Sequence, residues 1–445
     1  MFKFYRLTQQ KNSGGIMDKM KFLLCVLALS LALFPSSGYS KSLNIILPGL
    51  LNQHERIKAA EDRRDSAIHR LREAYGGWYP RVDLNADAGH ESVRDASNND
   101  TYEVKDTQQL KTTQLLTDFG KTSSTVERAR NELEGAKAGL LAVRQGILLE
   151  GIVAYLNVIK TREQLFYAKK SESNLQRQNS MEERLVKKKA GISSDVLQTR
   201  SQLAGSRALR VTFEGAFEKA KIRFKTVFKE DLTESEIKDF NLPELPASKL
   251  PETLDQAIET ALKSNPIIHQ AQYNVKTSEQ DLVNRKSTYY PNLNLFAEGN
   301  RRMNNSGEEG DKLELYAGVE LTYNFYKGGS DRAAIKAAQS NLSEAKNLLT
   351  ETEWITRQDT RNAWQDHITA SGSFKYLQEQ ADIMGEFLSL ARKERKLGTR
   401  SLLDVLNGEV SYINAISLAV SAKIDMLTFN YSLLRATGKL DMTIF

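Results

Sequence analysis

Histidines are the residues of this chain best suited to proton transfer or metal binding, and their spacing supports neither. The five are His54, His69, His90, His269 and His367, without a metal-binding pattern such as HExxH. The sequence has no glycine-rich phosphate loop, and its many paired carboxylates fall in charged helical stretches that are typical of protein surfaces. We therefore expect no enzyme, no cofactor and no metal site.

The charge of the chain is nearly balanced. Sixty-two Lys and Arg residues oppose 56 Asp and Glu residues, which leaves a formal charge of +6 over 445 residues. This small excess is spread along the chain, whereas a nucleic-acid-binding surface needs basic residues gathered on one face. The composition therefore favours an ordinary solvated surface and no nucleic-acid partner.

The N-terminal segment has the pattern of a secretory signal. Two lysines precede an apolar run over residues 22–34, and small residues follow before an expected cut near Ser40. We interpret residues 1–40 as a signal peptide, with residues 1–16 as an upstream extension. Cys25 lies inside this segment, so the mature chain is expected to have no thiol. No other apolar run approaches 18 residues, so the sequence predicts no transmembrane helix.

Residues 313–325 alternate between apolar and polar side chains, which predicts a strand with one apolar and one polar face. A membrane-crossing strand needs roughly 9–11 residues, although a half-buried strand of a soluble sandwich would look similar. The sequence predicts four such strands in two hairpins. One hairpin spans about 81–119, with a loop at 92–100, and the other spans about 291–326, with a loop at 301–311.

The chain contains an internal two-fold repeat. The first three of five matching pairs are separated by 211 residues, and the other two by 206 and 207. The pairs are Leu43 with Leu254, Tyr79 with Tyr290, Leu84 with Leu295, Phe119 with Phe325, and Gly191 with Gly398. We expect repeat 1 at 41–230, a linker at 231–252 and repeat 2 at 253–445, each opening with a helix (54–76 and 252–288).

Two very long helical hairpins follow from the distribution of proline. Residues 81–242 and 292–445 contain none, and a proline inside a helix costs about 3 kcal/mol. The predicted long helices are 121–189 and 329–397, within hairpins that span 121–229 and 329–436. At 1.5 Å per residue each long helix measures on the order of 100 Å.

Aromatic residues gather where the predicted strands meet the predicted helices. The six strongest candidates are Trp78, Tyr79, Phe119, Tyr290, Phe325 and Tyr326. Aromatic girdles mark the interfaces of transmembrane barrels, although aromatic residues are also common at strand ends in soluble folds. With a long strand that is polar on one side, this pattern favours a membrane interface.

Four strands cannot close a transmembrane barrel, because about eight are the minimum. An open sheet edge in lipid would leave backbone groups unpaired at several kcal/mol each. The predicted fold is therefore mainly α with transmembrane β, in which several copies share one barrel above long antiparallel α-helical hairpins.

This organisation resembles the TolC-type outer-membrane efflux and secretion channels over nearly all of residues 42–440. The motifs that carry the resemblance are Asn265-Pro266, Tyr79-Pro80, Tyr290-Pro291, Phe325-Tyr326-Lys327-Gly328-Gly329, the segment Ala190 to Gln198, and the segment Leu397 to Leu406. The resemblance implies a homotrimer with a 12-stranded β-barrel in the cell outer membrane and an α-barrel in the periplasm. It also implies a periplasmic adaptor protein and an inner-membrane pump or ABC exporter as partners.

The resemblance also implies two functional regions. The helical turns at Gly191, Ile192, Gly398 and Thr399 correspond to the tips that meet the adaptor. The periplasmic gate is expected to involve Ser194 and Asp195 on one side, with Arg361 and Asp366 on the other. Thr356 stands where the family has a tyrosine in the gate, so the gate is expected to differ in detail.

The sequence leaves an alternative function and the transported substrate open. An exported trimeric coiled-coil stalk or adhesin would also have long helices, but it would not need duplicated hairpins with a polar face. Within the channel interpretation, drug efflux and type I protein secretion are both compatible with the sequence. A passive duct leaves the choice of substrate mainly to its pump.

Overall fold

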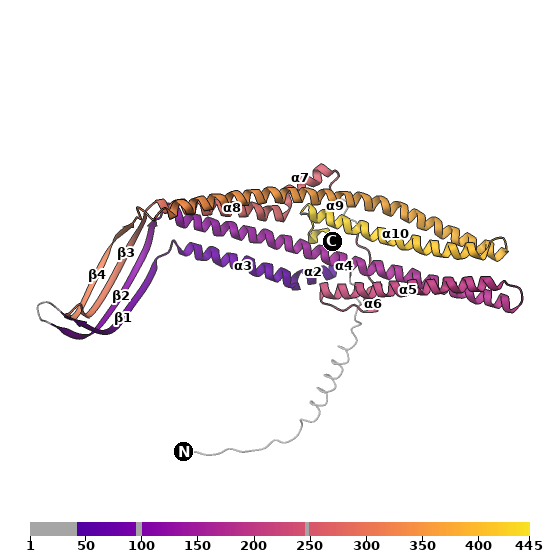
Figure 1. Cartoon of the computed structure of the whole chain (residues 1–445), viewed down its shortest axis with the longest axis horizontal. Coiled ribbons are helices and arrows are strands. Elements are labelled where there is room, and N and C mark those ends of the chain that lie inside the picture. Colours follow the sequence, from indigo (N-terminus) through magenta and orange to yellow (C-terminus); the bar gives the residue numbers. More distant parts are fainter. Residues whose placement is uncertain (1–41, 95–99, 245–248) are drawn as a thin grey trace, which may run out of the picture.

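The computed structural model describes residues 42–94, 100–244 and 249–445. The predicted signal peptide and Cys25 lie outside the described residues. Figure 1 shows an elongated molecule in which four strands form one end and the turns of two long helical hairpins form the other.

The elements of the two halves correspond one to one. The first half contains α2 (Leu43–Gln53), α3 (Glu55–Gly76), β1 (Arg81–Val93), β2 (Thr101–Thr117), α4 (Lys121–Lys187) and α5 (Ser193–Phe228). The second contains α7 (Leu254–Ser264), α8 (Pro266–Lys286), β3 (Asn292–Asn305), β4 (Glu308–Thr322), α9 (Ser330–Leu397) and α10 (Leu402–Ala436). Short elements are α6 (Glu234–Lys238) between the halves, η2 (Ser287–Tyr289) and η3 (Met442–Ile444). The repeat, the four strands and the long hairpins are therefore confirmed.

Two boundaries differ from the sequence prediction. The helix predicted over 252–288 is broken at Asn265, whose side chain accepts a hydrogen bond from the Ile267 amide and so caps α8. Pro266 favours the break because it has no N–H to donate to the preceding turn. The loop predicted over 301–311 was too long, since β3 and β4 continue to a tight turn around Ser306 and Gly307, both with positive φ.

The sheet is antiparallel in the order β1-β2-β3-β4, so β1 and β4 are its free edges within the chain. Register pairs such as Leu84 with Leu110 and Ala297 with Ala317 place the apolar positions on one face. This face is open in the single chain, where Leu315 is 80% exposed. The opposite face is polar, with Asp83 opposite Lys111.

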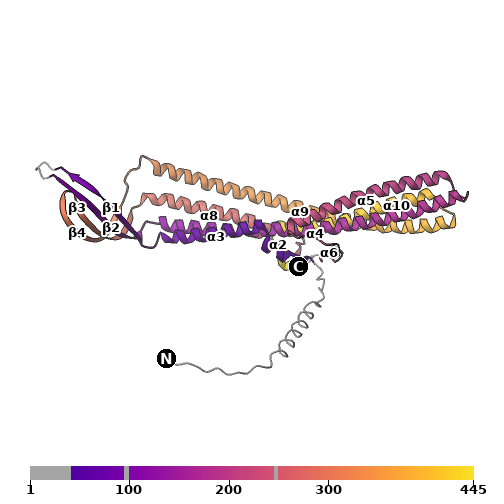
Figure 2. The ribbon, with the colours of Figure 1, turned by 90° about the horizontal axis from the view of Figure 1, so that it is seen from below.

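The helices continue the order of the strands. Next to the sheet, α3, α4, α8 and α9 lie side by side, and towards the far end α5, α4, α10 and α9 do so (Figure 2). Within the chain α9 is thus at one edge of the helical layer, where the short helix α7 also packs against it. The other edge is α3 near the sheet and α5 near the hairpin turns.

The main hydrophobic core lies midway along the molecule, where α2, α4, α5, α6 and the C-terminal end of α10 meet. Its largest fully buried side chains include Tyr155, Phe224, Phe240 and Tyr431. Gly151 allows α2 to approach α4, because a Cβ at this position would come within 2.4 Å of the Leu50 side chain.

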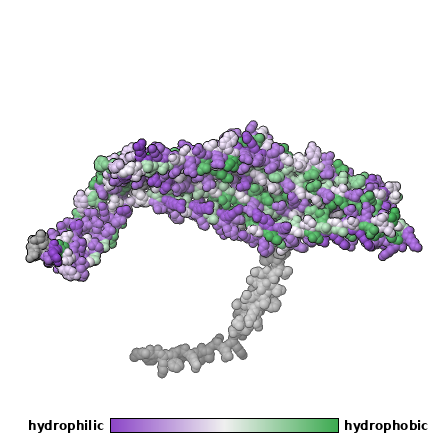
Figure 3. All heavy atoms as spheres, in the orientation of Figure 1, coloured by the Kyte–Doolittle hydropathy of each residue, from purple (hydrophilic) through white to green (hydrophobic). Residues whose placement is uncertain are grey.

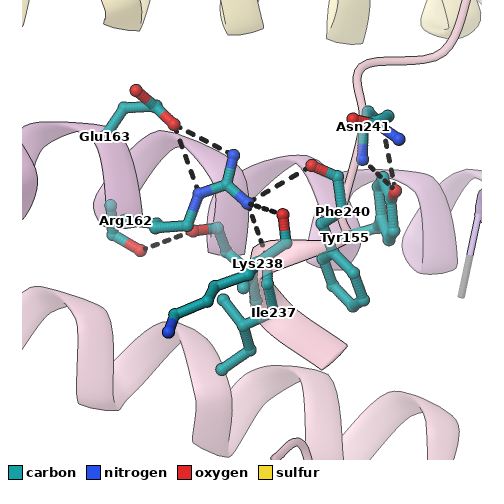
Figure 4. A network of polar contacts seen from close by, with 9 residues as sticks. Tyr155, Arg162, Glu163, Ile237, Lys238, Phe240 and Asn241 are labelled. Carbon is teal, nitrogen blue, oxygen red and sulfur yellow. Dashed lines mark hydrogen bonds and ion pairs between the residues drawn. The ribbon is translucent and has the colours of Figure 1, made fainter. Parts of the chain in front are cut away.

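Polar contacts attach the segment between the two halves to this core (Figure 4). The Arg162 guanidinium donates to the backbone carbonyls of Ile237 at 2.5 Å and Phe240 at 3.3 Å. The Tyr155 hydroxyl donates to the Asn241 carbonyl at 2.9 Å and accepts from the Asn241 amide at 3.1 Å. Residues 237–241 of this segment therefore have a fixed path across α4.

Positive φ angles reveal the true register of the repeat at the ends of the long helices. Phe119 (φ 54°) and Gly120 before α4 correspond to Gly328 (φ 59°) and Gly329 before α9. The predicted match of Phe119 with Phe325 was therefore wrong by three residues. The sequence predicts this match because both residues are phenylalanine. The equivalent positions are instead defined by the backbone conformation just before each long helix.

Two helices in the described part of the chain have an 18-residue window as apolar as a membrane-spanning helix. They are α4, with half of its window buried, and α10, with one third buried. Polar residues scattered through both windows interrupt their apolar runs. Figure 3 shows apolar residues spread over the half of the molecule that contains α5, α10 and the C-terminal parts of α4 and α9.

Candidate functional site

The two hairpin turns have the same backbone geometry and lie together at the end furthest from the sheet (Figure 1). After α9, the amides of Gly398 and Thr399 donate to the carbonyls of Arg395 and Glu394. After α4, those of Lys189 and Ala190 donate in the same way to Val186 and Leu185. This is the hydrogen-bonding pattern of a Schellman motif, in which a left-handed residue ends the helix.

Gly398 occupies the left-handed position of the second turn, with φ 81°, but Lys189 occupies it in the first, with φ 59°. The predicted match of Gly191 with Gly398 was therefore wrong by two residues. Gly191 has another role, because a Cβ there would lie 2.9 Å from the Leu185 Cβ. Ile192 and Thr399 are exposed at the turns.

Arg395 connects the two hairpins close to these turns. It lies on α9, and its guanidinium is 3.4 Å from Glu182 of α4 and 4.0 Å from Asp195 of α5. Glu182 is only 2% exposed and also accepts a hydrogen bond from Gln178 at 2.8 Å. A buried carboxylate needs such partners, since an unpaired buried charge costs several kcal/mol.

A second buried carboxylate reinforces the same contact. Glu409 of α10 is 4% exposed, forms an ion pair with Arg392 of α9, and accepts a hydrogen bond from Asn174 of α4 at 3.0 Å. Both carboxylates line a groove of about 590 Å³ between α4, α9 and α10. We call the contacts of Glu182 and Glu409 with Arg395, Arg392 and Asn174 the inter-hairpin polar contact.

The structure separates the predicted gate residues into two groups. Ser194 and Asp195 lie in the first turn of α5, at the tips. Arg361 and Asp366 lie on α9, and Arg361 precedes the end of that helix by about ten turns, or roughly 50 Å. A neighbouring copy related by rotation about the long axis would have each residue at the same height along that axis. Such a copy would therefore not bring the two groups of gate residues together. Thr356 lies still further from the tips.

Sequence reasoning missed Glu182, Arg392, Arg395 and Glu409. A signal was present: Glu409 falls on the same helical face as Leu402, Leu406 and Ile413, at positions where an apolar residue is expected. An acidic residue on the buried face of a helix requires a partner from a neighbouring helix.

The predicted girdle residues do lie at the junctions of strands and helices. Trp78, Tyr79 and Tyr290 precede the strands, and Phe119 stacks on Tyr290 with ring centroids 5.4 Å apart. Phe325 and Tyr326 follow β4. All six of these aromatic side chains are exposed in the single chain.

Comparison with known proteins decides the family. Residues 46–227 and 257–439 both match the model of the family described as outer membrane efflux protein. The chain belongs to this family. The two matched segments correspond to the two halves of the structure.

Individual members of the outer membrane efflux protein family agree with this assignment. The chain is 25% identical to the outer membrane efflux protein BepC of Brucella suis, over 76% of this chain and 73% of that protein. It is 22% identical to the outer membrane protein TolC of Escherichia coli, over 95% of this chain and 87% of TolC.

Among solved structures, the outer-membrane channel OprN superposes with a TM-score of 0.77 at 18% identity, over 89% of this chain and 90% of OprN. The Campylobacter jejuni CmeC channel gives 0.75 at 16% identity, over 90% and 87%. These likenesses confirm the predicted fold.

Family membership locates the protein in the outer membrane, with its helical part extending into the periplasm. It also identifies the chain as an outer-membrane efflux channel protein, as the sequence predicted. The alternative of a stalk or adhesin without a pore is not supported, since the family is one of transport channels.

Proposed function

We propose that three copies of this chain form the outer-membrane exit duct of a tripartite efflux or type I secretion system. The observation that carries the proposal is the sheet, which has two unpaired edges, one apolar face and one polar face. In lipid, both edges require a partner. Three copies give twelve strands, with β4 of one copy beside β1 of the next.

The edge of the helical layer supports the same assembly. Exposed apolar residues recur on α9 at multiples of seven positions, which is the spacing of a coiled-coil seam. They are Leu348, Ile355, Tyr376, Ile383, Leu390 and Leu397. The opposite edge, α5, exposes Leu197, Ala204 and Val211, also seven apart. We infer that α9 packs on α5 of the neighbouring copy.

The tips are the proposed docking surface for a periplasmic adaptor, which would connect the duct to an inner-membrane pump or ABC exporter. Ile192 and Leu397 give this surface apolar contacts, and five lysines give it positive charge. Among the described residues, none of these lysines has an ion-pair partner. They are Lys187, Lys188, Lys189, Lys393 and Lys396. Charge of this kind speeds association with an acidic partner.

The inter-hairpin polar contact is the proposed closure of the periplasmic entrance, together with Ser194 and Asp195. It connects the α4–α5 hairpin to the α9–α10 hairpin, so its loss would let the hairpins separate at their tips. Arg361 and Asp366 are not part of this proposal. The duct itself is proposed to be passive, and it requires no catalytic group.

Conductance of purified trimers in planar lipid bilayers tests the function. We expect stable ion-conducting channels, and a water-soluble monomer without conductance would overturn the proposal. Replacement of Gly398 by Leu tests docking, because φ 81° disfavours any side chain with a Cβ. Export should fall while trimers remain intact; Gly146→Ala, at an uncrowded helical position, is the matched control.

A further inference from the structure

Two aromatic rings lie on the polar face of the sheet, where almost every other side chain is charged or hydrogen-bonding. Phe296 of β3 and Tyr316 of β4 have ring centroids 5.3 Å apart and planes tilted by 54°. The register pairs place them on the same face as Glu298, Asn300 and Glu314. In the proposed trimer this face lines the pore, so three such pairs would surround the axis at one height.

The two rings differ in how they are covered. Phe296 lies opposite Gly318, where a Cβ would meet its ring at 3.4 Å. The Lys111 ammonium lies over the ring at 5.0 Å and pairs with Glu320 at 3.8 Å, so it covers Phe296 from the pore side. Tyr316 is 60% exposed. Both rings lie beside Gly318, since a Cβ there would also be 3.3 Å from the Tyr316 hydroxyl, but only Tyr316 remains largely exposed.

Acidic residues outnumber basic residues on this face. Within the regularly paired part of the strands it carries five basic residues (Arg81, Lys105, Lys111, Arg302 and Lys312) and seven acidic residues. The acidic residues are Asp83, Asp87, Glu91, Glu103, Glu298, Glu314 and Glu320. Glu298 is the register partner of Tyr316 and accepts a hydrogen bond from Asn300 at 3.2 Å. An exposed aromatic ring therefore lies beside a carboxylate in an acidic wall.

We propose that Tyr316, with Glu298, forms a binding site in the pore for hydrophobic aromatic cations. The inference rests on the proposed trimeric duct. An aromatic face attracts cations and stacks on other rings, while the acidic wall favours positive over negative solutes. Solutes of this class would be retained at the site, whereas aliphatic cations of equal charge would pass with weaker contact.

Block of the open channel by two cations tests the site. Tetraphenylphosphonium and tetrabutylphosphonium carry the same charge, and only the first is aromatic. For wild-type trimers in planar bilayers, we expect half-block by tetraphenylphosphonium at a concentration about three- to five-fold lower than by tetrabutylphosphonium. Tyr316→Ser should abolish this difference, and Tyr316→Phe should keep it.

Tyr102→Ser is the matched control, because Tyr102 lies on the apolar outer face and is 70% exposed in the single chain, similar to the 60% of Tyr316. It should leave the difference unchanged. Glu298→Gln should weaken block by both cations. Equal block of wild-type channels by the two cations, or a difference that survives in Tyr316→Ser trimers, would overturn the site while leaving the duct intact. Absence of conductance from wild-type trimers would instead contradict the proposed function.

Discussion

Replacement of Arg395 by Ala should open the periplasmic entrance. The change removes the cation that joins Glu182 of α4 to α9, at 3.4 Å, and that also approaches Asp195 of α5. Glu182 would then remain buried with only the hydrogen bond from Gln178. The hairpins can relieve this cost by separating, since separation exposes the carboxylate to water.

The size of the effect follows from burial. Removal of one partner from a buried ion pair costs about 3–5 kcal/mol, and the 27% exposure of the Arg395 side chain reduces this to about 2–3 kcal/mol. A shift of that size changes an equilibrium about 30- to 150-fold. An entrance open for about 1% of the time would then be open for about a quarter of the time or more.

Single-channel recording of purified trimers measures this shift as a rise in mean conductance. Arg200→Ala is the matched control, because Arg200 forms an ion pair at 2.9 Å with Glu183, also close to the tips, but joins only α4 and α5. The reasoning is wrong if Arg395→Ala trimers conduct like the wild type, or if Arg200→Ala raises conductance as much.

Three further changes test the helical part of the chain. Lys189→Gly should raise stability by about 1 kcal/mol per chain, because glycine accepts φ 59° without strain; a lower Tm would contradict this. Arg162→Ala should speed limited proteolysis of the segment near Asn241, since three backbone contacts are lost; an unchanged cleavage rate would refute the anchoring role. Burial raises the pKa of Tyr155 to about 12. The unfolded chain loses this proton near pH 10 and the folded chain does not, so stability should fall between pH 10 and 12. Denaturant titrations should show a smaller fall for Tyr155→Phe.

The parts of the fold that follow a period along the chain could be predicted from sequence. Strict alternation in residues 313–325 predicted β4, and the lack of proline over 81–242 predicted the continuous α4. Helix breaks were harder, because the capping side chain of Asn265 acts locally and interrupts an otherwise helical pattern.

The tips show why residue roles were harder to predict than elements. Gly191 was matched with Gly398 because both are glycine, whereas the backbone places Lys189 at that position. The sequence predicts a gate role for Arg361 but does not show how far this residue lies from the tips along α9. The inter-hairpin polar contact joins Glu182 to Arg395, residues separated by more than two hundred positions. Periodic sequence patterns predict helices and strands, but they do not predict a contact between two such distant residues.

The unbroken length of α9 has a mechanical consequence. From the middle of the molecule, near Thr356, to its end at Leu397 the helix extends about 60 Å. A stiff rod of that length, tilted by only about 5° at its midpoint, would carry its far end sideways by about 5 Å. Small rearrangements of packing at mid-height can thus be magnified into a wide aperture without unwinding a single turn.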